Sequence, residues 1–133
     1  MYLLDTNICI FALKDKFPAL KEKLLTVHPD EIAISSVTVF ELEYGAAKSK
    51  WGDKTREVLG RFLSSYEILP FKAEDAAICG RLRAALTAAG TPIGAYDIMI
   101  AAQGVARGLT VITNNTGEFS RVPSLRLEDW TGQ

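Results

Sequence analysis

The chain has 133 residues, of which 48% are apolar and 23% charged, a composition typical of one globular domain with a real core. The formal net charge of −1 is not that of a basic nucleic-acid binder, although acids gathered around divalent metals would leave the remaining surface positive. No apolar run approaches the ~20 residues of a membrane span. The chain begins directly on a predicted strand, without a charged n-region, so we expect no signal peptide and a cytoplasmic protein.

Hydrophobic periodicity predicts strands that alternate with helices along the chain. We expect strands at residues 2–4, 31–35, 67–71, 109–113 and 125–127. We expect helices at residues 6–13, 18–27, 36–48, 51–66, 73–89 and 95–107. This alternation predicts an α/β fold in which residues 1–133 form one domain, with a parallel central sheet flanked by helices on both faces.

An acidic residue follows the first predicted strand, where a buried edge should prefer apolar side chains. Asp5, Thr6 and Asn7 can all accept hydrogen bonds from free N–H groups at a helix start, so helix capping is one interpretation. Asp5 could also bind a metal ion at the end of the strand, and the two roles can coexist.

Cysteine and histidine are too scarce to form a metal centre of thiolates or imidazoles. Cys9 and Cys79 lie in apolar helical patterns without a CxxC spacing, which predicts two buried thiols. His28 is the single histidine and precedes a proline in a predicted turn. This composition disfavours a zinc site and any mechanism that needs a histidine base.

A second acid lies in the helix that follows the second predicted strand. On a helical projection, Val37, Phe40 and Tyr44 form one apolar stripe. Glu41 falls on this inward stripe, and Glu43 falls on the opposite side. Because a lone buried carboxylate is costly unless it is paired or bound to a metal, Glu41 is a candidate ligand.

A capping box is the structural alternative for Glu41. The spacing Thr38-x-x-Glu41 fits that pattern if the helix begins at Thr38. The pair Ser35 and Ser36 offers an earlier cap, which would remove the capping role from Glu41.

A third acid, Asp97, lies in the first turn of a later helix. It shares a face with Ile100, Ala101 and Gly104, and small residues on this face predict close packing against the sheet. A carboxylate in a first turn also interacts favourably with the helix dipole, and this is the alternative interpretation.

The last polar cluster follows the buried strand that ends at Thr113. Asn114 and Asn115 come directly after it, and Glu118 follows slightly later. Asparagines after a strand are usually turn formers, which is the structural alternative.

Taken together, these polar residues predict one binding site, because open parallel sheets bind ligands beyond the carboxyl ends of their strands. Asp5, Glu41, Asp97 and Asn115 could all converge on that edge. Clustered carboxylates repel one another unless a cation neutralises them. Oxygen ligands without His or Cys select Mg²⁺ or Mn²⁺, and such a site suits hydrolysis of a phosphodiester.

Four segments also carry a family resemblance, and they cover nearly the whole chain in order. LLDTN, SSVTVFELEYG, PIGAYDIMIA and TNNTGEF resemble the four motifs of PIN-domain ribonucleases. Their arrangement is most similar to that of the VapC toxins of bacterial toxin–antitoxin pairs. The resemblance implies a Mg²⁺- or Mn²⁺-dependent endoribonuclease, held inactive by a VapB-type antitoxin. It also implies a homodimer that contacts operator DNA only through the antitoxin.

The resemblance assigns roles to individual residues. Three positions match the core acids of the family, which are metal ligands: Asp5, Glu41 and Asp97. Thr6 and Thr113 match its recurrent site hydroxyls. Apart from the resemblance, we expect Thr6 and Asn7 to cap the first helix and hold the Asp5 carboxylate in place. Asn115 stands where many members carry Asp, so Glu118 could supply the fourth catalytic carboxylate, or the site could use three acids.

The most similar toxins imply a tRNA substrate, with initiator tRNA cut in its anticodon loop as the specific case. Four lysines that end helices near the motifs are candidate phosphate contacts: Lys14, Lys16, Lys48 and Lys50. A solvated face or a favourable interaction with helix C-termini is the alternative for these lysines.

Two other functions compete with the ribonuclease. A Mg²⁺-dependent phosphatase would need a second Asp after Asp5, where this chain has Asn7. A non-catalytic co-repressor would act through an antitoxin, because the chain has no helix-turn-helix signal and little basic patterning.

An apolar surface for the homodimer is predicted from residues away from the inward stripe. Val39 and Leu42 lie off that stripe, and Trp51 with Leu59 adds apolar surface nearby. An exposed patch of more than a few hundred Å² usually marks an interface.

Overall fold

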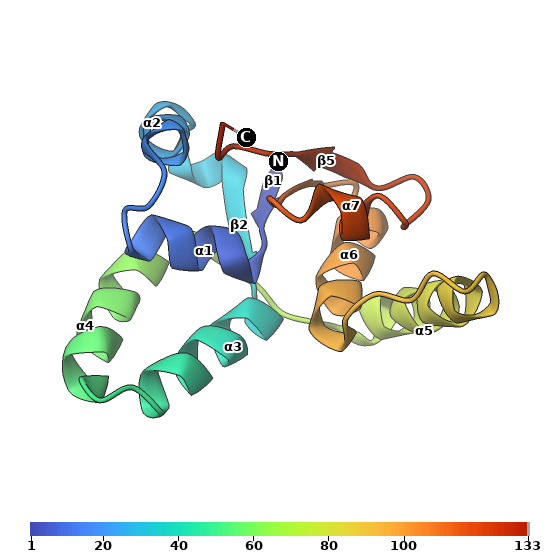
Figure 1. The fold of residues 1–133 in the computed structure, drawn as a ribbon, viewed down its shortest axis with the longest axis horizontal. Helices are drawn as coiled ribbons and strands as arrows, with labels where there is room; N and C mark the ends of the chain where they lie inside the picture. The colour runs from blue at the N-terminus through green and yellow to red at the C-terminus, as the bar shows by residue number, and fades with distance from the viewer. Residues whose placement is uncertain (133) are drawn as a thin grey trace.

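The computed structural model describes residues 1–132 as a central sheet between two groups of helices (Figure 1). The strands are β1 (Tyr2–Leu4), β2 (Ile32–Ser35), β3 (Glu67–Leu69), β4 (Thr110–Ile112) and β5 (Arg126–Glu128). The α-helices are α1 (Thr6–Leu13), α2 (Pro18–Thr26), α3 (Ser36–Ala47), α4 (Gly52–Leu63), α5 (Ala73–Ala88), α6 (Ala95–Arg107) and α7 (Thr116–Phe119). A 3₁₀ turn, η1 (Pro29–Glu31), leads into β2.

The five strands are parallel and follow the order β3-β2-β1-β4-β5. Leu4 of the central strand pairs in register with Ile34 of β2 and Ile112 of β4. The strands therefore end at the same edge, where Asp5 and Thr113 follow β1 and β4. The prediction of an α/β fold with a parallel sheet is confirmed.

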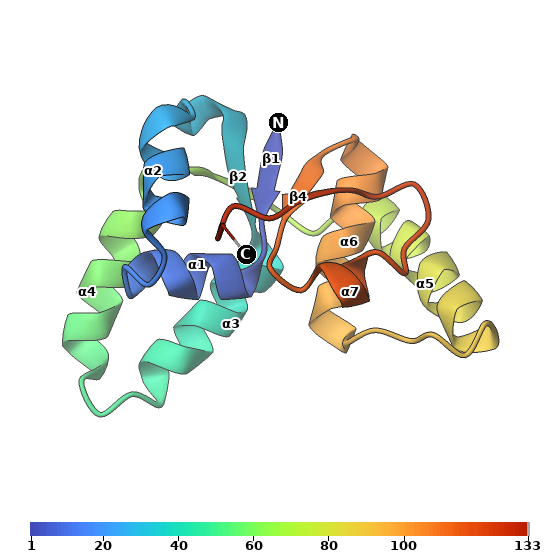
Figure 2. The same ribbon diagram turned by 45° about the horizontal axis from the view of Figure 1, so that its top comes forward.

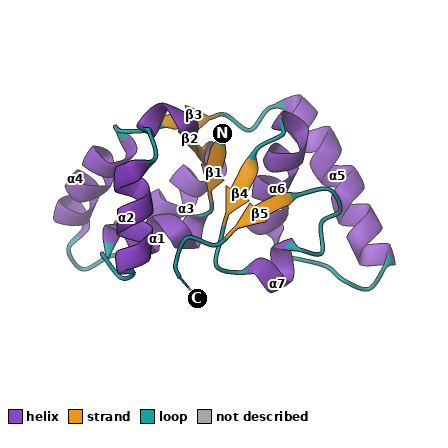
Figure 3. Ribbon diagram, turned by 90° about the horizontal axis from the view of Figure 1, so that it is seen from above, coloured by secondary structure: helices purple, strands orange, loops and turns teal. Residues whose placement is uncertain are grey.

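Helices cover both faces of the sheet, as predicted. Successive strand residues point to opposite faces, so Leu3 belongs to one core and Leu4 to the other. The core around Leu3 packs against α5, α6 and α7, and the core around Leu4 packs against α1 to α4. Figures 2 and 3 show these two groups on either side of the strands.

Most predicted elements are present with small changes at their ends. The strand predicted at 67–71 stops at Leu69, since Pro70 has no N–H to donate to a neighbouring strand. Residues 116–119, for which no helix was predicted, form the short helix α7. Within residues 1–132, every helix is too short or too polar to cross a membrane.

The two thiols differ in their surroundings. Cys9 is fully buried, and Cys79 is partly exposed. Burial raises the pKa of both thiols above the ordinary value, so both stay protonated near neutral pH. The prediction of two buried thiols is therefore confirmed for Cys9 alone.

The predicted apolar stripe of α3 is wrong. Phe40 and Tyr44 are 53% and 60% exposed, whereas Thr38, Leu42 and Ala46 are buried. Residues 38, 42 and 46 lie one turn apart and form the face that packs toward α1 and α4. The projection failed because the buried face begins with a polar threonine, while two large rings point outward.

The apolar surface predicted for dimerisation is wrong for the same reason. Leu42 and Leu59 are both buried in the core beside α1, and Val39 is partly buried against it. Of the predicted surface, only Trp51 is largely exposed. The phase error on α3 had placed Leu42 on the outer face.

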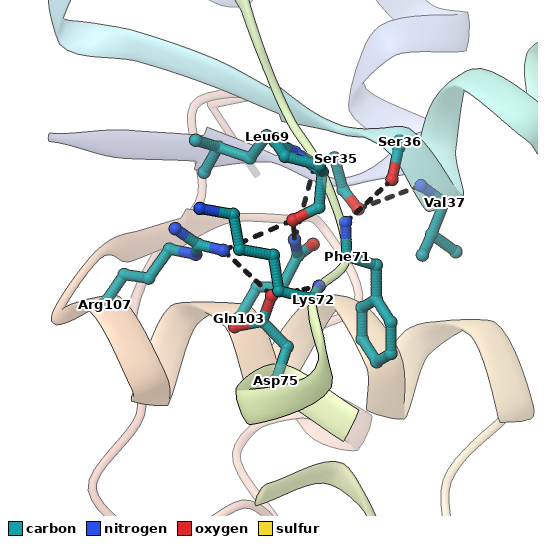
Figure 4. A network of polar contacts seen from close by, with 10 residues as sticks. Ser35, Ser36, Val37, Leu69, Phe71, Lys72, Asp75, Gln103 and Arg107 are labelled. Carbon is teal, nitrogen blue, oxygen red and sulfur yellow. Dashed lines mark hydrogen bonds and ion pairs between the residues drawn. The ribbon is translucent and has the colours of Figure 1, made fainter. Parts of the chain in front are cut away.

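A buried polar network joins α5 and α6 to the loop after β3 (Figure 4). The Asp75 carboxylate accepts hydrogen bonds from the Lys72 N–H at 2.8 Å and from Arg107 Nη2 at 2.9 Å. Gln103 Nε2 and Arg107 Nη2 both donate to the Pro70 carbonyl, at 3.3 and 3.2 Å. Because Asp75 is fully buried, its charge depends on these donors.

Replacing Arg107 by methionine should destabilise the fold. The free energy of unfolding at pH 7 is expected to fall by about 3 kcal/mol, because the buried Asp75 carboxylate loses its cation. Burial raises the pKa of Asp75, but the Lys72 N–H and the Arg107 guanidinium outweigh this and hold the pKa below its usual value. The Arg107 contribution is therefore lost progressively as pH falls from about 4 through the lowered pKa of Asp75, and the difference between variant and wild type should shrink over that range.

Urea denaturation between pH 3 and 7 measures this difference. Arg81→Met, which removes an exposed arginine of α5, is the matched control and should change stability little. A loss in Arg107→Met that is no larger than in the control would contradict the role of the network.

Candidate active site

Asp5 occupies the first position beyond β1 and is buried. Its Oδ1 accepts a hydrogen bond from the Ile8 N–H at 2.8 Å, and its own N–H donates to the Ile112 carbonyl at 3.0 Å. Asp5 itself is therefore the N-cap of α1, which confirms the capping interpretation for this residue, whereas Thr6 and Asn7, also expected to cap the helix, do not. Asn7 is exposed on the first turn.

The Thr6 hydroxyl links α1 to α3. It donates to Glu41 Oε1 at 2.6 Å and lies 3.0 Å from the Thr38 hydroxyl oxygen. Glu41 is half-buried, so its carboxylate is oriented by a neighbouring helix. The structure excludes a capping box for Glu41, because α3 begins earlier and Ser35 caps it by accepting from the Val37 N–H.

Asp97 and Glu118 approach each other around Gly94, the N-cap of α6. Glu118 accepts hydrogen bonds from the Gly94 N–H and from Asn115 Nδ2, both at 2.6 Å. A Cβ on Gly94 would lie 3.5 Å from an oxygen of each carboxylate, so Gly94 lies between the two acids. Gly104, further along α6, packs directly against Val111 of β4, as the small residues on this face predicted.

The four acids influence one another electrostatically. Burial, and then the negative charges of Glu118, Asp5 and Glu41, raise the pKa of Asp97 to about 6. Burial also raises the pKa of Asp5 to about 6, with smaller contributions from the charges of Glu41 and Asp129. The structure therefore brings Asp5, Glu41, Asp97 and Glu118 into one electrostatic cluster.

Thr113 and Asn115 support this cluster from β4. The Thr113 hydroxyl hydrogen-bonds Asp5 and favours its charged form, and Thr113 Oγ1 also accepts from the Asn115 N–H at 2.9 Å. The amide of Asn115 donates to Glu118, so its nitrogen points at a carboxylate. Both residues therefore orient acids.

One acid near the site was missed by the sequence analysis. Asp129 follows β5, and its charge raises the pKa of Asp5. Its Oδ1 accepts from the N–H and the hydroxyl of Thr131, at 2.9 and 2.6 Å. The signal was present, because Asp129 follows the last parallel strand just as Asp5 follows β1.

The four candidate lysines are all exposed, and the structure separates them. Lys14 lines the same groove as Glu41, which has a volume of about 760 Å³. Lys16, Lys48 and Lys50 lie over aromatic rings, with Nζ 4.9 to 5.7 Å from the ring centroids. Lys14 is thus the candidate that shares a cavity with a site acid.

The donor set fits a hydrated hard cation. In the described part of the chain, no three His, Cys, Asp or Glu side chains are spaced to enclose a metal ion by themselves. Mg²⁺ commonly keeps several waters and binds through one or two carboxylates together with substrate phosphate. Two acids with raised pKa values, grouped with two further carboxylates, provide the negative charge that such an ion would neutralise.

Comparisons with known proteins agree with this arrangement. The sequence model of the PIN domain family matches residues 2–125. The chain is 43% identical to a tRNA(fMet)-specific endonuclease VapC of Salmonella typhimurium over 97% of both chains. It is 40% identical to a ribonuclease VapC2 of Rickettsia felis over 98% of both chains. The crystal structure of DNA-bound VapBC from Salmonella typhimurium contains a chain that superimposes with a TM-score of 0.92, with 43% identity and 97% coverage of each chain.

A parallel sheet with acids grouped at its carboxyl edge is the architecture of a PIN-domain nuclease. The chain belongs to the VapC ribonucleases of the PIN-domain family. The resemblance seen in the four sequence motifs is confirmed.

The charge of Asp5 should make the metal-free fold less stable at neutral pH. Its raised pKa means that the folded state holds a proton more tightly than the unfolded state, so stability falls as pH rises from about 4 through 6. Asp5→Asn removes the charge but keeps an oxygen that can accept from the Ile8 N–H. We expect the free energy of unfolding at pH 8 to rise by about 1–3 kcal/mol and the gain to vanish below pH 4.

The measurement is urea denaturation with a chelator present, from pH 4 to pH 8. Asp30→Asn, which removes an exposed acid in η1, should show no such gain. If Asp5→Asn is less stable than wild type at pH 8, the charge of Asp5 does not destabilise the metal-free fold.

Proposed function

We propose that this VapC ribonuclease hydrolyses RNA phosphodiesters with the help of Mg²⁺ or Mn²⁺, held as a partly hydrated ion among Asp5, Glu41 and Asp97. The observation that carries the proposal is the grouping of buried Asp5 and half-buried Asp97 with further carboxylates, where burial and then the neighbouring charges raise the pKa of both acids. Repulsion among these carboxylates destabilises the fold when no cation is bound. A divalent ion relieves that repulsion, so the same arrangement favours binding of the ion. The match of the PIN domain family over residues 2–125 supports the same chemistry.

The side chains have separate tasks in this proposal. When bound, a divalent ion would activate water and stabilise the leaving oxygen. Asp5 is held by the Ile8 N–H and the Thr113 hydroxyl, so its carboxylate has a fixed direction. Thr6 holds Glu41 by the 2.6 Å hydrogen bond, and Asp97 faces the same cluster from α6. The contacts to Asp5 and Glu41 hold these two carboxylates in place before substrate arrives.

We propose a tRNA substrate, and specifically initiator tRNA cut in its anticodon loop. The Salmonella typhimurium and Shigella flexneri relatives, each 43% identical over nearly the whole chain, are named tRNA(fMet)-specific endonucleases. Lys14 borders the groove that reaches Glu41 and is the proposed phosphate contact there. Such an enzyme would act in the cytoplasm, where tRNA is found.

A VapB-type antitoxin is the proposed partner. Similar structures are VapBC complexes from Salmonella typhimurium and Rickettsia felis, both with DNA. The groove between α1, α3 and α4 is lined largely by apolar side chains, among them Ile10, Leu13 and Val58, and it includes Glu41. An antitoxin segment in this groove would cover a site acid, and operator DNA would be contacted through the antitoxin.

A homodimer remains a proposal that rests on family resemblance. The surface predicted for it from sequence is excluded, since Leu42 and Leu59 are buried. The phosphatase alternative is disfavoured because the curated relatives that match along the chain are ribonucleases. A purely non-catalytic co-repressor would have no need for four mutually repelling carboxylates.

Sequencing of RNA ends after brief expression tests the proposed activity. Wild-type protein should create new ends at one position in the anticodon loop of initiator tRNA. Glu41→Gln should abolish them, because Glu41 loses the charge that Thr6 holds toward the cluster. Glu43→Gln is the matched control and should stay within a few-fold of wild type, since Glu43 is exposed and pairs with Arg56 at 3.7 Å.

Equal losses in the Glu41 and Glu43 variants would refute the assignment of Glu41 as a ligand. New RNA ends in both wild type and Glu41→Gln would show that the cleavage does not depend on the Glu41 carboxylate.

Glu118 is proposed as a fourth, less essential carboxylate. Both of its oxygens accept hydrogen bonds, from Gly94 and Asn115, so it can contribute charge while being held in place. We expect Glu118→Gln to lower the initial rate less than Asp97→Asn, and raised Mn²⁺ to restore part of it. Titrating Mg²⁺ and Mn²⁺ against the initial rate of both variants measures the difference. A Glu118→Gln rate equal to wild type at every metal concentration would leave Glu118 a structural residue.

A further inference from the structure

Three partly exposed aromatic rings lie in a row beside the site. Phe40 and Tyr44 are one turn apart on α3, and the Tyr96 ring meets Phe40 edge-on with ring centroids 5.6 Å apart. Tyr96 is 46% exposed, which is close to the exposure of the other two rings. One turn beyond Tyr44, Lys48 Nζ lies 4.9 Å from the centroid of the Tyr44 ring. We call Tyr96, Phe40, Tyr44 and Lys48 the aromatic strip.

The aromatic strip begins at the carboxylates. Phe40 directly precedes Glu41, and Tyr96 directly precedes Asp97. Because successive helical residues point about 100° apart, α3 turns Glu41 toward Thr6 while Phe40 stays exposed. Two exposed rings therefore lie within one residue of two of the acids, where a polymer bound at the acids can contact them.

The chemistry of the strip suits unpaired nucleobases. Proteins hold single-stranded nucleic acid by stacking bases on aromatic rings and by placing cations near the phosphates. The strip combines three rings with one lysine. Glu43, an acid on the same helix, is paired with Arg56 at 3.7 Å, which reduces its repulsion of phosphate.

The size of the strip favours a base over a protein partner. Three half-exposed rings present roughly 300 Å², taking about 200 Å² for each whole ring. A stable protein interface buries about 800 Å² on each partner. One or two bases need only the ring faces that the strip offers.

We propose that the aromatic strip binds unpaired bases of the RNA substrate next to the cleaved phosphodiester. Tyr96 and Phe40 stack on the nearest base, and Tyr44 with Lys48 holds the following nucleotide. This inference rests on the proposed RNA hydrolysis and gives a physical reason for cleavage in the anticodon loop. The cleaved bond must lie in an unpaired segment such as a loop, because a base inside a duplex cannot stack on a side chain.

The test uses the anticodon stem-loop of tRNA(fMet) with 2-aminopurine at one loop position at a time. Binding is followed by fluorescence in an Asp5→Asn background that does not cleave, and KM and kcat are measured in the cleaving protein. Tyr96→Leu and Phe40→Leu remove a ring, Tyr96→Phe keeps it, and Leu25→Ala changes an exposed apolar residue of α2. Light scattering reports the oligomeric state of every variant.

We expect fluorescence to be quenched at the position beside the cleaved bond. Tyr96→Leu and Phe40→Leu should abolish the quenching and raise KM roughly 5- to 100-fold, with kcat within about 2-fold of wild type. Tyr96→Phe and Leu25→Ala should behave as wild type. A merely structural role for the rings would not give this separation of KM from kcat.

Several outcomes would overturn the base site. The base site is refuted if KM is unchanged in both leucine variants. It is also refuted if wild-type protein cleaves the stem-loop but fluorescence is quenched at no loop position. A leucine variant that dissociates a dimer and loses kcat would show that the strip is an interface between copies. Quenching by a wild type that cuts no RNA would instead support the base site and refute the proposed hydrolysis.

Discussion

The parallel register of the central strand is the constraint on which the site depends. Leu4 lies level with Ile34 and Ile112, so β1, β2 and β4 end together. Asp5 and Thr113 leave the sheet at this edge, and α3 departs from it directly after β2. A slip of one residue would exchange the two faces of β1 and send Leu4 to the wrong core. The two hydrophobic cores thus fix where the carboxylates meet.

The position of the acids costs stability, and polar neighbours offset part of that cost. Asp5 accepts from the Ile8 N–H, Glu41 accepts from the Thr6 hydroxyl, and Glu118 accepts from Gly94 and Asn115. These donors stabilise the charged forms, while burial and mutual repulsion oppose them. For Asp5 and Asp97 the opposing effects dominate, since their pKa values rise to about 6. Above pH 6 these two carboxylates are largely deprotonated, so the site then attracts a metal cation in place of a proton.

Hydrophobic periodicity predicted the elements whose ends are determined by interactions within the same segment. The bounds of β1 and α6 agree with the periodicity, and Asp5 and Asp97 follow from their places beside these elements. The phase of α3 depends on tertiary packing, which buries the polar Thr38 and leaves large rings outside. The strand before Asp129 was predicted, but its parallel pairing with β4, which brings Asp129 to the same edge as Asp5, cannot be read from this three-residue segment alone.

The spacing between α3 and α6 is determined by contacts that lie away from the acids. Ser36 at the start of α3 accepts a hydrogen bond from the Phe71 N–H, and Gln103 of α6 donates to the Pro70 carbonyl next to it. Both helices are therefore fastened to one short loop, which Asp75 also holds through Lys72. One turn further along α3, and at the N-terminal end of α6, the Phe40 and Tyr96 rings pack edge-on, next to Glu41 and Asp97. A change in this loop would thus be transmitted to the carboxylates and to the aromatic strip together, because both depend on the same spacing of two rigid helices.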